Sequence, residues 1–338
     1  MVLAVLVVGG ITRLTESGLS ITSWKPISGI VPPLTPSQWQ AEFDGYKRIP
    51  QYAAFNRGMT LAGFKQIFFW EFLHRLLARS IGTVLALVLA VFWWKRWIPT
   101  GYGKRALLIL ALGGLQGLIG WWMVASGLQD RVEVSHLRLA THLLAAMLIY
   151  GVLIWTALDL LDAPGAGQPA VARLRFWPAA AIMALAIQLM LGAFTAGLRA
   201  GYAFASWPLM GDSWFPAGGW QAERGIGWNL LFNPVAVQFV HRWWAWVVAG
   251  AVLLLARVVW RRPGGREPAI AVSLAILLQI GLGVATLLSG VALPLAVAHQ
   301  ATGALLLGAV IWCAHGLGRA PVRRDRRKWI ERAAVPVS

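Results

Sequence analysis

Long apolar stretches recur along the chain and restrict its fold more than any other feature of the sequence. A helix needs about 20 mostly apolar residues to cross the hydrocarbon core of a bilayer. With 58% hydrophobic and 13% charged residues, the sequence lies far outside the range of soluble proteins. It predicts an all-α integral membrane protein with eight transmembrane helices, the first of them in the shorter apolar fragment 1–10. The other seven are expected at 67–94, 106–126, 137–160, 176–197, 237–260, 269–290 and 293–317.

The basic residues, which give a net charge of +17, are concentrated in alternate connections between these segments. Because positively charged loops stay on the cytoplasmic side, we expect both termini and the connections 95–105, 159–175 and 257–266 in the cytoplasm. The same short runs can contact anionic lipid headgroups. Nucleic-acid binding would need them on a soluble domain, so we expect no nucleic acid as a partner. The external loops would be 11–66, 127–136 and 198–236.

Four histidines lie within the apolar segments at matched places. His74 in WEFLHRLLAR is followed by His142 in the next span but one, and His241 in QFVHR is followed in the same way by His299. Each would fall near the start of a helix that runs inward from the external face, so all four would lie at a similar depth. A histidine inside the bilayer is costly and usually functional. Two pairs therefore predict two sites of the same kind.

An internal repeat supports this pairing. We expect two four-helix bundles in the same orientation, a parallel repeat of the kind found in duplicated membrane proteins. The units would be an N-terminal bundle at 1–160, a cytoplasmic linker at 161–175, a C-terminal bundle at 176–318 and a basic cytoplasmic tail at 319–338. The long loop of the first unit is a candidate cap over its site. The residues that recur after a constant offset of 183 positions are Thr12, Gly18, Ser23 and Trp24, matched by Thr195, Gly201, Ser206 and Trp207.

Two neutral imidazoles that face each other across a helical bundle can hold heme iron from both sides. A zinc or di-metal site is the weaker alternative, because it needs further carboxylate or thiolate ligands. Only Glu71 is nearby, and the one cysteine, Cys313, lies in an apolar segment. The plainer alternative for each histidine is a hydrogen bond to a neighbouring helix. Arg75 and Arg242, which each follow a histidine directly, are candidates for contacts with heme propionates or else reach toward lipid headgroups.

The two halves differ at one position that matters for chemistry. Glu71 precedes His74 by three residues, so the two share a helix face, whereas Gln238 stands at the same place before His241. A glutamine cannot carry charge at neutral pH, but a carboxylate near a heme edge can stabilise a developing cation or handle protons. We therefore expect a reactive heme in the first half and an auxiliary heme in the second. The alternative role for Glu71 is a salt bridge to Arg75.

The remaining features stand outside this scheme. We expect His136 at the external surface or beside a propionate, and His315 at the cytoplasmic end of the last span, neither of them as a ligand. The fragment 1–10 has about half the length of a spanning helix. Either the polar run that follows continues this helix, or the native start lies upstream of Met1, which is the explanation we expect.

The motifs resemble those of heme A synthases of the mitochondrial and alphaproteobacterial type over nearly the whole chain. The resemblance implies an eight-helix oxidoreductase of the bacterial inner (plasma) membrane, which oxidises the C8 methyl of heme O to a formyl group through successive hydroxylations. The product, heme A, serves terminal oxidase assembly. The matching motifs are GGITRLTESGLSITSWKPISGIVPP, EFLHR, RLATHL, FVHRWWAW and AVAHQATGALLL.

The resemblance also implies roles for single residues. Substrate heme would lie between His74 and His142, and heme b would be bound between His241 and His299. Glu71 would be the catalytic acid, with a role in stabilising a carbocation that captures water. Some members carry two cysteines in the first external loop. Their absence here leaves the electron route open.

A diheme cytochrome b that carries electrons without substrate chemistry is the main alternative. It would hold two permanent hemes, so a carboxylate in only one half favours the enzyme. A transporter built from parallel repeats would need a polar cavity at mid-depth, for which the spans offer few charged residues. The sequence leaves open the electron donor, any homo-oligomer and the partner that delivers heme O, by family analogy the heme O synthase.

Overall fold

The computed structural model describes residues 1–25, 28–161 and 172–318, and in this part of the chain it is helical without strands. Seven helices are long and apolar enough to cross a membrane, which confirms the seven long spans. One boundary differs because Thr60 caps α4: its side-chain oxygen accepts from the backbone N of Gly63, so the helix begins well before residue 67. The seven are α4 (Leu61–Trp94), α5 (Gly103–Ala125), α6 (His136–Leu161), α7 (Phe176–Gly197), α9 (Pro234–Trp260), α10 (Arg266–Leu288) and α11 (Leu293–Gly318).

The eighth predicted span is the helix α1 (Val2–Leu14), which has 13 residues. At 1.5 Å per residue it covers about 20 Å, less than the ~30 Å of a bilayer core, so eight spanning helices are not confirmed. The helix continues into the polar run that begins at Ile11 and ends within it, at Leu14. Its Thr12 hydroxyl lies 3.2 Å from the carbonyl oxygen of Trp70, which joins α1 to α4.

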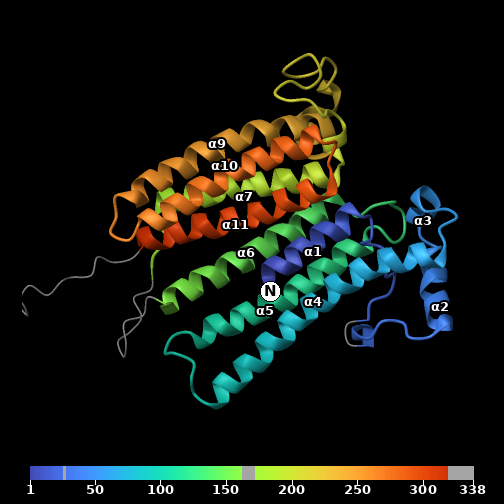
Figure 1. Cartoon of the computed structure of the whole chain (residues 1–338), viewed down its shortest axis with the longest axis horizontal. Helices are drawn as coiled ribbons and strands as arrows, with labels where there is room; N and C mark the ends of the chain where they lie inside the picture. The colour runs from blue at the N-terminus through green and yellow to red at the C-terminus, as the bar shows by residue number, and fades with distance from the viewer. Residues whose placement is uncertain (26–27, 162–171, 319–338) are drawn as a thin grey trace, which may run out of the picture.

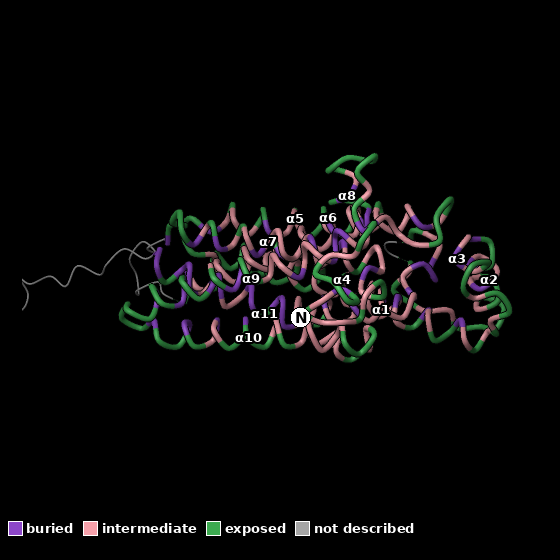
Figure 2. Tube along the Cα trace, turned by 90° about the horizontal axis from the view of Figure 1, so that it is seen from above, coloured by how far each residue is buried: buried purple, intermediate pink, exposed green. Residues whose placement is uncertain are grey.

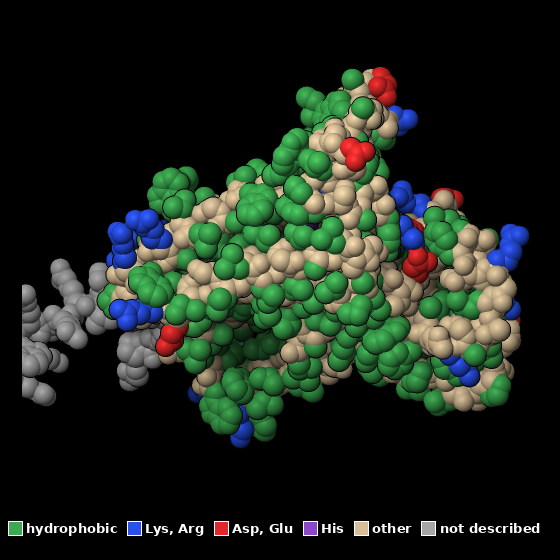
Figure 3. Space-filling model, turned by 45° about the horizontal axis from the view of Figure 1, so that its top comes forward, with side chains coloured by type: hydrophobic (Ala, Val, Ile, Leu, Met, Phe, Trp, Pro, Cys, Tyr) green, Lys and Arg blue, Asp and Glu red, His purple; other side chains and the backbone are tan. Residues whose placement is uncertain are grey.

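Figure 1 shows the long helices in two groups that lie side by side, with α1, α4, α5 and α6 in one and α7, α9, α10 and α11 in the other. The polar segments predicted as external loops gather at one end, and the connections at 95–102 and 261–265 lie at the opposite end. Apolar side chains cover much of the flank between the two ends (Figure 3). The predicted linker and tail fall largely on 162–171 and 319–338, outside the described residues. The short helices are α2 (Pro36–Tyr46), α3 (Pro50–Phe55) and α8 (Gly225–Phe232), with 3-10 turns at Ser28–Ile30, Ala200–Tyr202 and Ala222–Arg224.

The largest apolar core lies in the C-terminal group and reaches into the other one. It joins α7, α9, α10 and α11 to Met147 of α6 and Leu6 of α1, and Figure 2 shows buried positions along these helices. In the most apolar window of α11, 39% of residues are buried, whereas in that of α4 none is. α4 is therefore less enclosed by protein than α11, and the N-terminal group is the more open of the two.

The first long loop is not a plain loop, because it folds into α2 and α3 and packs on the start of α4. Its apolar core is aromatic: the Phe43 and Phe64 rings stack with centroids 5.0 Å apart, and Tyr46 is fully buried beside them. The Tyr46 hydroxyl is held by Gln51 and Asn56. This packing places a folded cap against the N-terminal part of α4.

A charged network joins the two groups of helices at the loop end. Arg13 at the end of α1 pairs with Glu133 at 3.0 Å. Glu133 also pairs with Arg199, which follows α7 and in turn pairs with Glu16. Glu16 and Arg199 stand 183 positions apart, and both adopt a left-handed backbone conformation. Equivalent ends of α1 and α7 therefore meet directly.

A second buried ion pair fixes the opposite end. Asp159 of α6, whose side chain is fully buried, accepts from Arg105 of α5 at 2.6 Å and contacts Nε2 of His315 of α11 at 2.9 Å. The backbone N of Ala172 adds a further donor at 3.2 Å. One carboxylate thus ties three helices together.

Replacing this carboxylate is expected to destabilise the fold. Because a buried ion pair that loses one partner leaves the other uncompensated, Asp159→Asn should lower the free energy of unfolding by about 3–5 kcal/mol. Thermal unfolding in detergent, followed by tryptophan fluorescence, measures the change. Asp44→Asn, which alters an exposed acid on α2, is the control and should shift stability by less than about 0.5 kcal/mol. Equal melting curves for both variants would contradict the role of Asp159.

Candidate functional site

Glu71 lies within α4 and is buried, with 2% of its surface exposed. Its Oε2 accepts from the Ser20 hydroxyl and from the backbone N of Ile21, both at 2.7 Å. Its Oε1 accepts from Nε and Nη2 of Arg75 at 3.1 and 2.6 Å. An ionised carboxylate offers about four acceptor sites, so this one is nearly saturated. The salt bridge considered as the alternative role of Glu71 is present, and it holds the group as a charge in a fixed orientation.

Arg75 and Arg242 make the same contacts in the two halves. Each guanidinium donates to two carbonyl oxygens at matched positions of the segment that follows the first helix of its half, at 2.9 to 3.5 Å. Arg242 donates to a third, that of Leu209, at 3.3 Å. The matched acceptors again differ by 183 positions. Both arginines therefore fasten a loop to a helix, a role that the sequence did not suggest. The matched acceptors are Ile21 and Ser23 for Arg75, and Phe204 and Ser206 for Arg242.

Gln238 takes the place of Glu71 in the second half and is equally buried. Its Nε2 donates to the carbonyl oxygen of Phe204 at 3.2 Å, and its Oε1 has no hydrogen-bond partner among the described residues. No side chain or backbone N–H converges on it as Ser20 and Ile21 converge on Glu71. The two halves therefore have the same arrangement of helix and loop at this place, but one half carries a carboxylate there and the other an amide.

The four histidines lie on the predicted helices: His74 is on α4 and His142 on α6, and His241 is on α9 and His299 on α11. Their pairing around a common ligand stays a prediction. All four are partly buried. Among the described residues, no group of three or more His, Cys, Asp or Glu side chains is placed to hold a metal ion. The zinc or di-metal alternative therefore has no support.

The orientation of one ring can be read directly. Nδ1 of His299 lies 3.1 Å from the carbonyl oxygen of Gln279 on α10. A ring N–H that donates to this carbonyl leaves Nε2 as the unprotonated nitrogen, which is the form that binds a metal. His142 is the opposite case, because the Gln116 side-chain amide on α5 donates to its Nδ1 at 3.1 Å. The N–H of a neutral ring is then on Nε2. The contact of His299 therefore gives the ring form that binds a metal through Nε2, and that of His142 does not.

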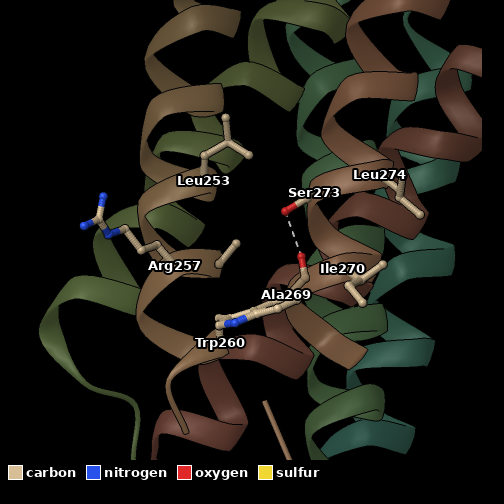
Figure 4. Close-up of a pocket in the computed structure, with 8 residues that line it drawn as sticks. Leu253, Arg257, Trp260, Ala269, Ile270, Ser273 and Leu274 are labelled. Atoms are coloured by element: carbon tan, nitrogen blue, oxygen red, sulfur yellow. Dashed lines mark hydrogen bonds between the residues drawn. The ribbon is translucent and has the colours of Figure 1, made fainter. Parts of the chain in front are cut away.

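Two cavities lie outside the space between the histidines. One of about 330 Å³ lies between the first loop and α4, with Arg75 and Arg79 in its wall, next to the turn that carries Glu71. The other, of similar volume, is a groove between α9 and α10 near Trp260 (Figure 4). Its Ser273 hydroxyl is used within the helix, donating to Ala269 at 2.8 Å, so this groove offers no group for the chemistry.

Comparison with known proteins agrees with this geometry. The chain matches the family described as cytochrome oxidase assembly protein, COX15-CtaA, over residues 1–311. The chain belongs to this family. No solved structure matches it.

Several relatives in the COX15-CtaA family carry the name heme A synthase. That of Rhizorhabdus wittichii is 62% identical over 322 residues, which cover 95% of this chain and 92% of the relative. That of Sphingopyxis alaskensis is 51% identical, with 94% and 89% covered, and that of Rhodospirillum centenum is 49% identical, with 93% and 85% covered. The resemblance seen in the motifs is therefore confirmed.

One of the two other histidines of this COX15-CtaA chain differs from expectation. His136 is not at the surface: it is buried, its Nε2 lies 2.7 Å from the carbonyl oxygen of Leu231, and its ring packs between Phe194 and Phe232. His315 does lie at the far end of the last span, where it is buried against Asp159. Both have structural contacts, and neither joins a histidine pair.

Sequence reasoning missed the residues that hold the acid. Ser20 and Ile21 lie in the TESGLSITSW motif, but nothing in that motif shows that it folds back 50 residues onto α4. It also missed Gln116 and Gln279, which contact the histidines of this family member from neighbouring helices. The sequence did hold a signal for these two glutamines. In each of the two apolar segments, QGLIG and QIGLG, a glutamine stands four residues before a glycine.

Proposed function

We propose that this chain is a heme A synthase, an oxidoreductase that converts heme O to heme A by oxidising the C8 methyl to a formyl group. The observation that carries the proposal is a buried carboxylate held beside one histidine pair only, with a glutamine at the matched place beside the other. Relatives that carry this name cover more than nine tenths of the chain. An electron carrier with two equivalent hemes would have no use for this difference, so it is not favoured.

In this proposal the two pairs have different occupants. Substrate heme O is held between His74 and His142, and heme b is held between His241 and His299. The more open packing around α4 suits a substrate that must enter and leave, whereas the well-packed C-terminal group suits a permanent cofactor. When bound, heme supplies the redox chemistry, and the chain supplies ligands, orientation and charge.

Glu71 is proposed to act as an oriented negative charge. Its two oxygens accept four hydrogen bonds, two of them from the guanidinium of Arg75. A carboxylate held this way can stabilise positive charge that develops on a substrate bound beside His74. Because the group is already oriented, stabilisation costs no reorganisation during the reaction. Propionate contacts by Arg75 and Arg242 stay a prediction.

The remaining proposals concern architecture and setting. Matched contacts at a constant offset of 183 positions support a duplicated chain, in which α1 serves as the eighth membrane helix. The long loops gather at one end of the molecule. This supports their placement outside the bacterial inner membrane, with both termini in the cytoplasm. Partners would be membrane lipid, a heme O synthase and an electron donor, whether or not the chain forms a homo-oligomer.

The function is tested by expressing the full chain with and without a heme O synthase in cells that lack their own heme A synthase. Hemes are extracted from purified protein and from membranes and are separated by chromatography. We expect heme B alone without the heme O source, and heme O or heme A alongside heme B with it. Heme B alone in both cultures would contradict the proposal.

A further inference from the structure

Each of the four paired histidines lies against a glycine of a neighbouring helix. A methyl group added at any of these glycines would lie 2.8 to 3.1 Å from Cε1 of the imidazole, closer than or at the limit of real contacts between such carbons. We call these four positions the glycine seats. They are Gly9 under His74, Gly120 under His142, Gly192 under His241 and Gly283 under His299.

Among the described glycines, these four are the ones at which an added methyl group would meet an imidazole ring. Gly117 is on α5, as Gly120 is, and Gly281 is on α10, as Gly283 is, yet an added methyl group at Gly117 or Gly281 would meet nothing within 4 Å. The same holds for Gly250 on α9. Glycine therefore occurs along these helices for more than one reason, and at the seats it lets an imidazole ring approach the helix backbone.

A second position belongs to each glycine seat: the residue four positions, or one helical turn, before it. In three of four cases it is a glutamine. The amide of Gln116 donates to the carbonyl oxygen of His142 at 2.9 Å, and that of Gln188 donates to the carbonyl oxygen of His241 at 3.0 Å. Gln279 accepts from Nδ1 of His299 through its backbone carbonyl at 3.1 Å. The fourth case is Val5, which has no side-chain donor.

We infer that the glycine seats and the glutamines before them are positioning residues, which set the depth and rotation of the axial imidazoles. The inference rests on the proposed heme-binding function. An imidazole ring that lies this close to a helix backbone has little room to tilt, so the glycine limits its orientation. Groups that orient a metal-ligating histidine in this way typically affect metal affinity 10–100-fold.

The test uses the purified full chain with its bound heme. Gly283→Ala should raise the rate of heme B transfer to excess apomyoglobin about 10–100-fold and shift the low-spin electron paramagnetic resonance signal of the ferric protein. Gly281→Ala, two residues away on the same helix, is the matched control and should leave both measurements unchanged. Gly120→Ala should leave heme B bound and weaken the retention of heme O. In each of these two variants, the heme that stays bound shows that the other half is folded.

Three results would overturn the inference. Gly283→Ala could match the parent in rate and spectrum, or Gly281→Ala could release heme as fast as Gly283→Ala, which would indicate general helix packing. Alternatively, Gly120→Ala and Gly283→Ala could weaken both hemes equally. A parent protein that shows no low-spin signal from two axial imidazoles would instead overturn the proposed function, and the inference with it.

Discussion

Glu71→Gln is expected to reduce the conversion of heme O to heme A by at least about 100-fold while both hemes remain bound. The substitution keeps the shape and the hydrogen-bonding capacity of the side chain but removes its charge. Loss of one preorganised electrostatic contact to a developing charge typically costs 10²–10³ in rate. Heme extraction from cells that carry the variant and a heme O source measures the ratio of heme A to heme O directly.

The fold itself indicates that this variant will be stable. Gln238 already occupies the equivalent buried place beside Arg242, whose guanidinium still donates to the loop carbonyls. Glu42→Gln is the matched control, because it removes a carboxylate from an ion pair with Lys25 in the same external cap. It should leave heme A formation at the parental level. Parental heme A in cells carrying Glu71→Gln would show that the charge is not needed.

The membrane helices could be predicted from the sequence because each is set by its own residues. An apolar run of sufficient length folds as a helix in lipid whatever surrounds it, since backbone groups must be paired internally. α7 follows from such a local pattern and is found over the predicted range, Phe176–Gly197. The pairing of the histidines stays a prediction. α1 shows the limit of this reasoning, because a run of ten apolar residues does not reveal where the helix ends.

The hydrogen bonds of the site could not be predicted, because they join segments far apart in the chain. Ser20 reaches Glu71, and Arg75 reaches Ile21, only after the cap has folded on α4. The burial of His136 depends in the same way on Leu231, 95 positions later. Periodicity shows which face of a helix a residue occupies, but not which loop covers that face. The salt bridge from Glu71 to Arg75 was the exception, because both ends lie on one helix, four residues apart.

His299→Leu is expected to remove heme B from the purified chain, with its content falling more than about tenfold. The reason is that loss of an axial ligand costs more than loss of the groups that orient it, which already amounts to 10–100-fold. The variant should still bind heme O, because His74 and His142 lie in the other pair. Heme content by chromatography and the low-spin electron paramagnetic resonance signal report the two sites separately.

The reciprocal variant distinguishes two unlike sites from two equivalent ones. His142→Leu should keep heme B and lose heme O retention and heme A formation. His136→Gln is the control for loss of a buried histidine outside the pairs, because glutamine can still donate to Leu231, and it should leave both hemes in place. If His142→Leu and His299→Leu each lost the same share of both hemes, the assignment of substrate to one pair and cofactor to the other would be wrong. If they separate the two hemes cleanly, the position of Glu71 beside only the first pair explains why only one of them is oxidised.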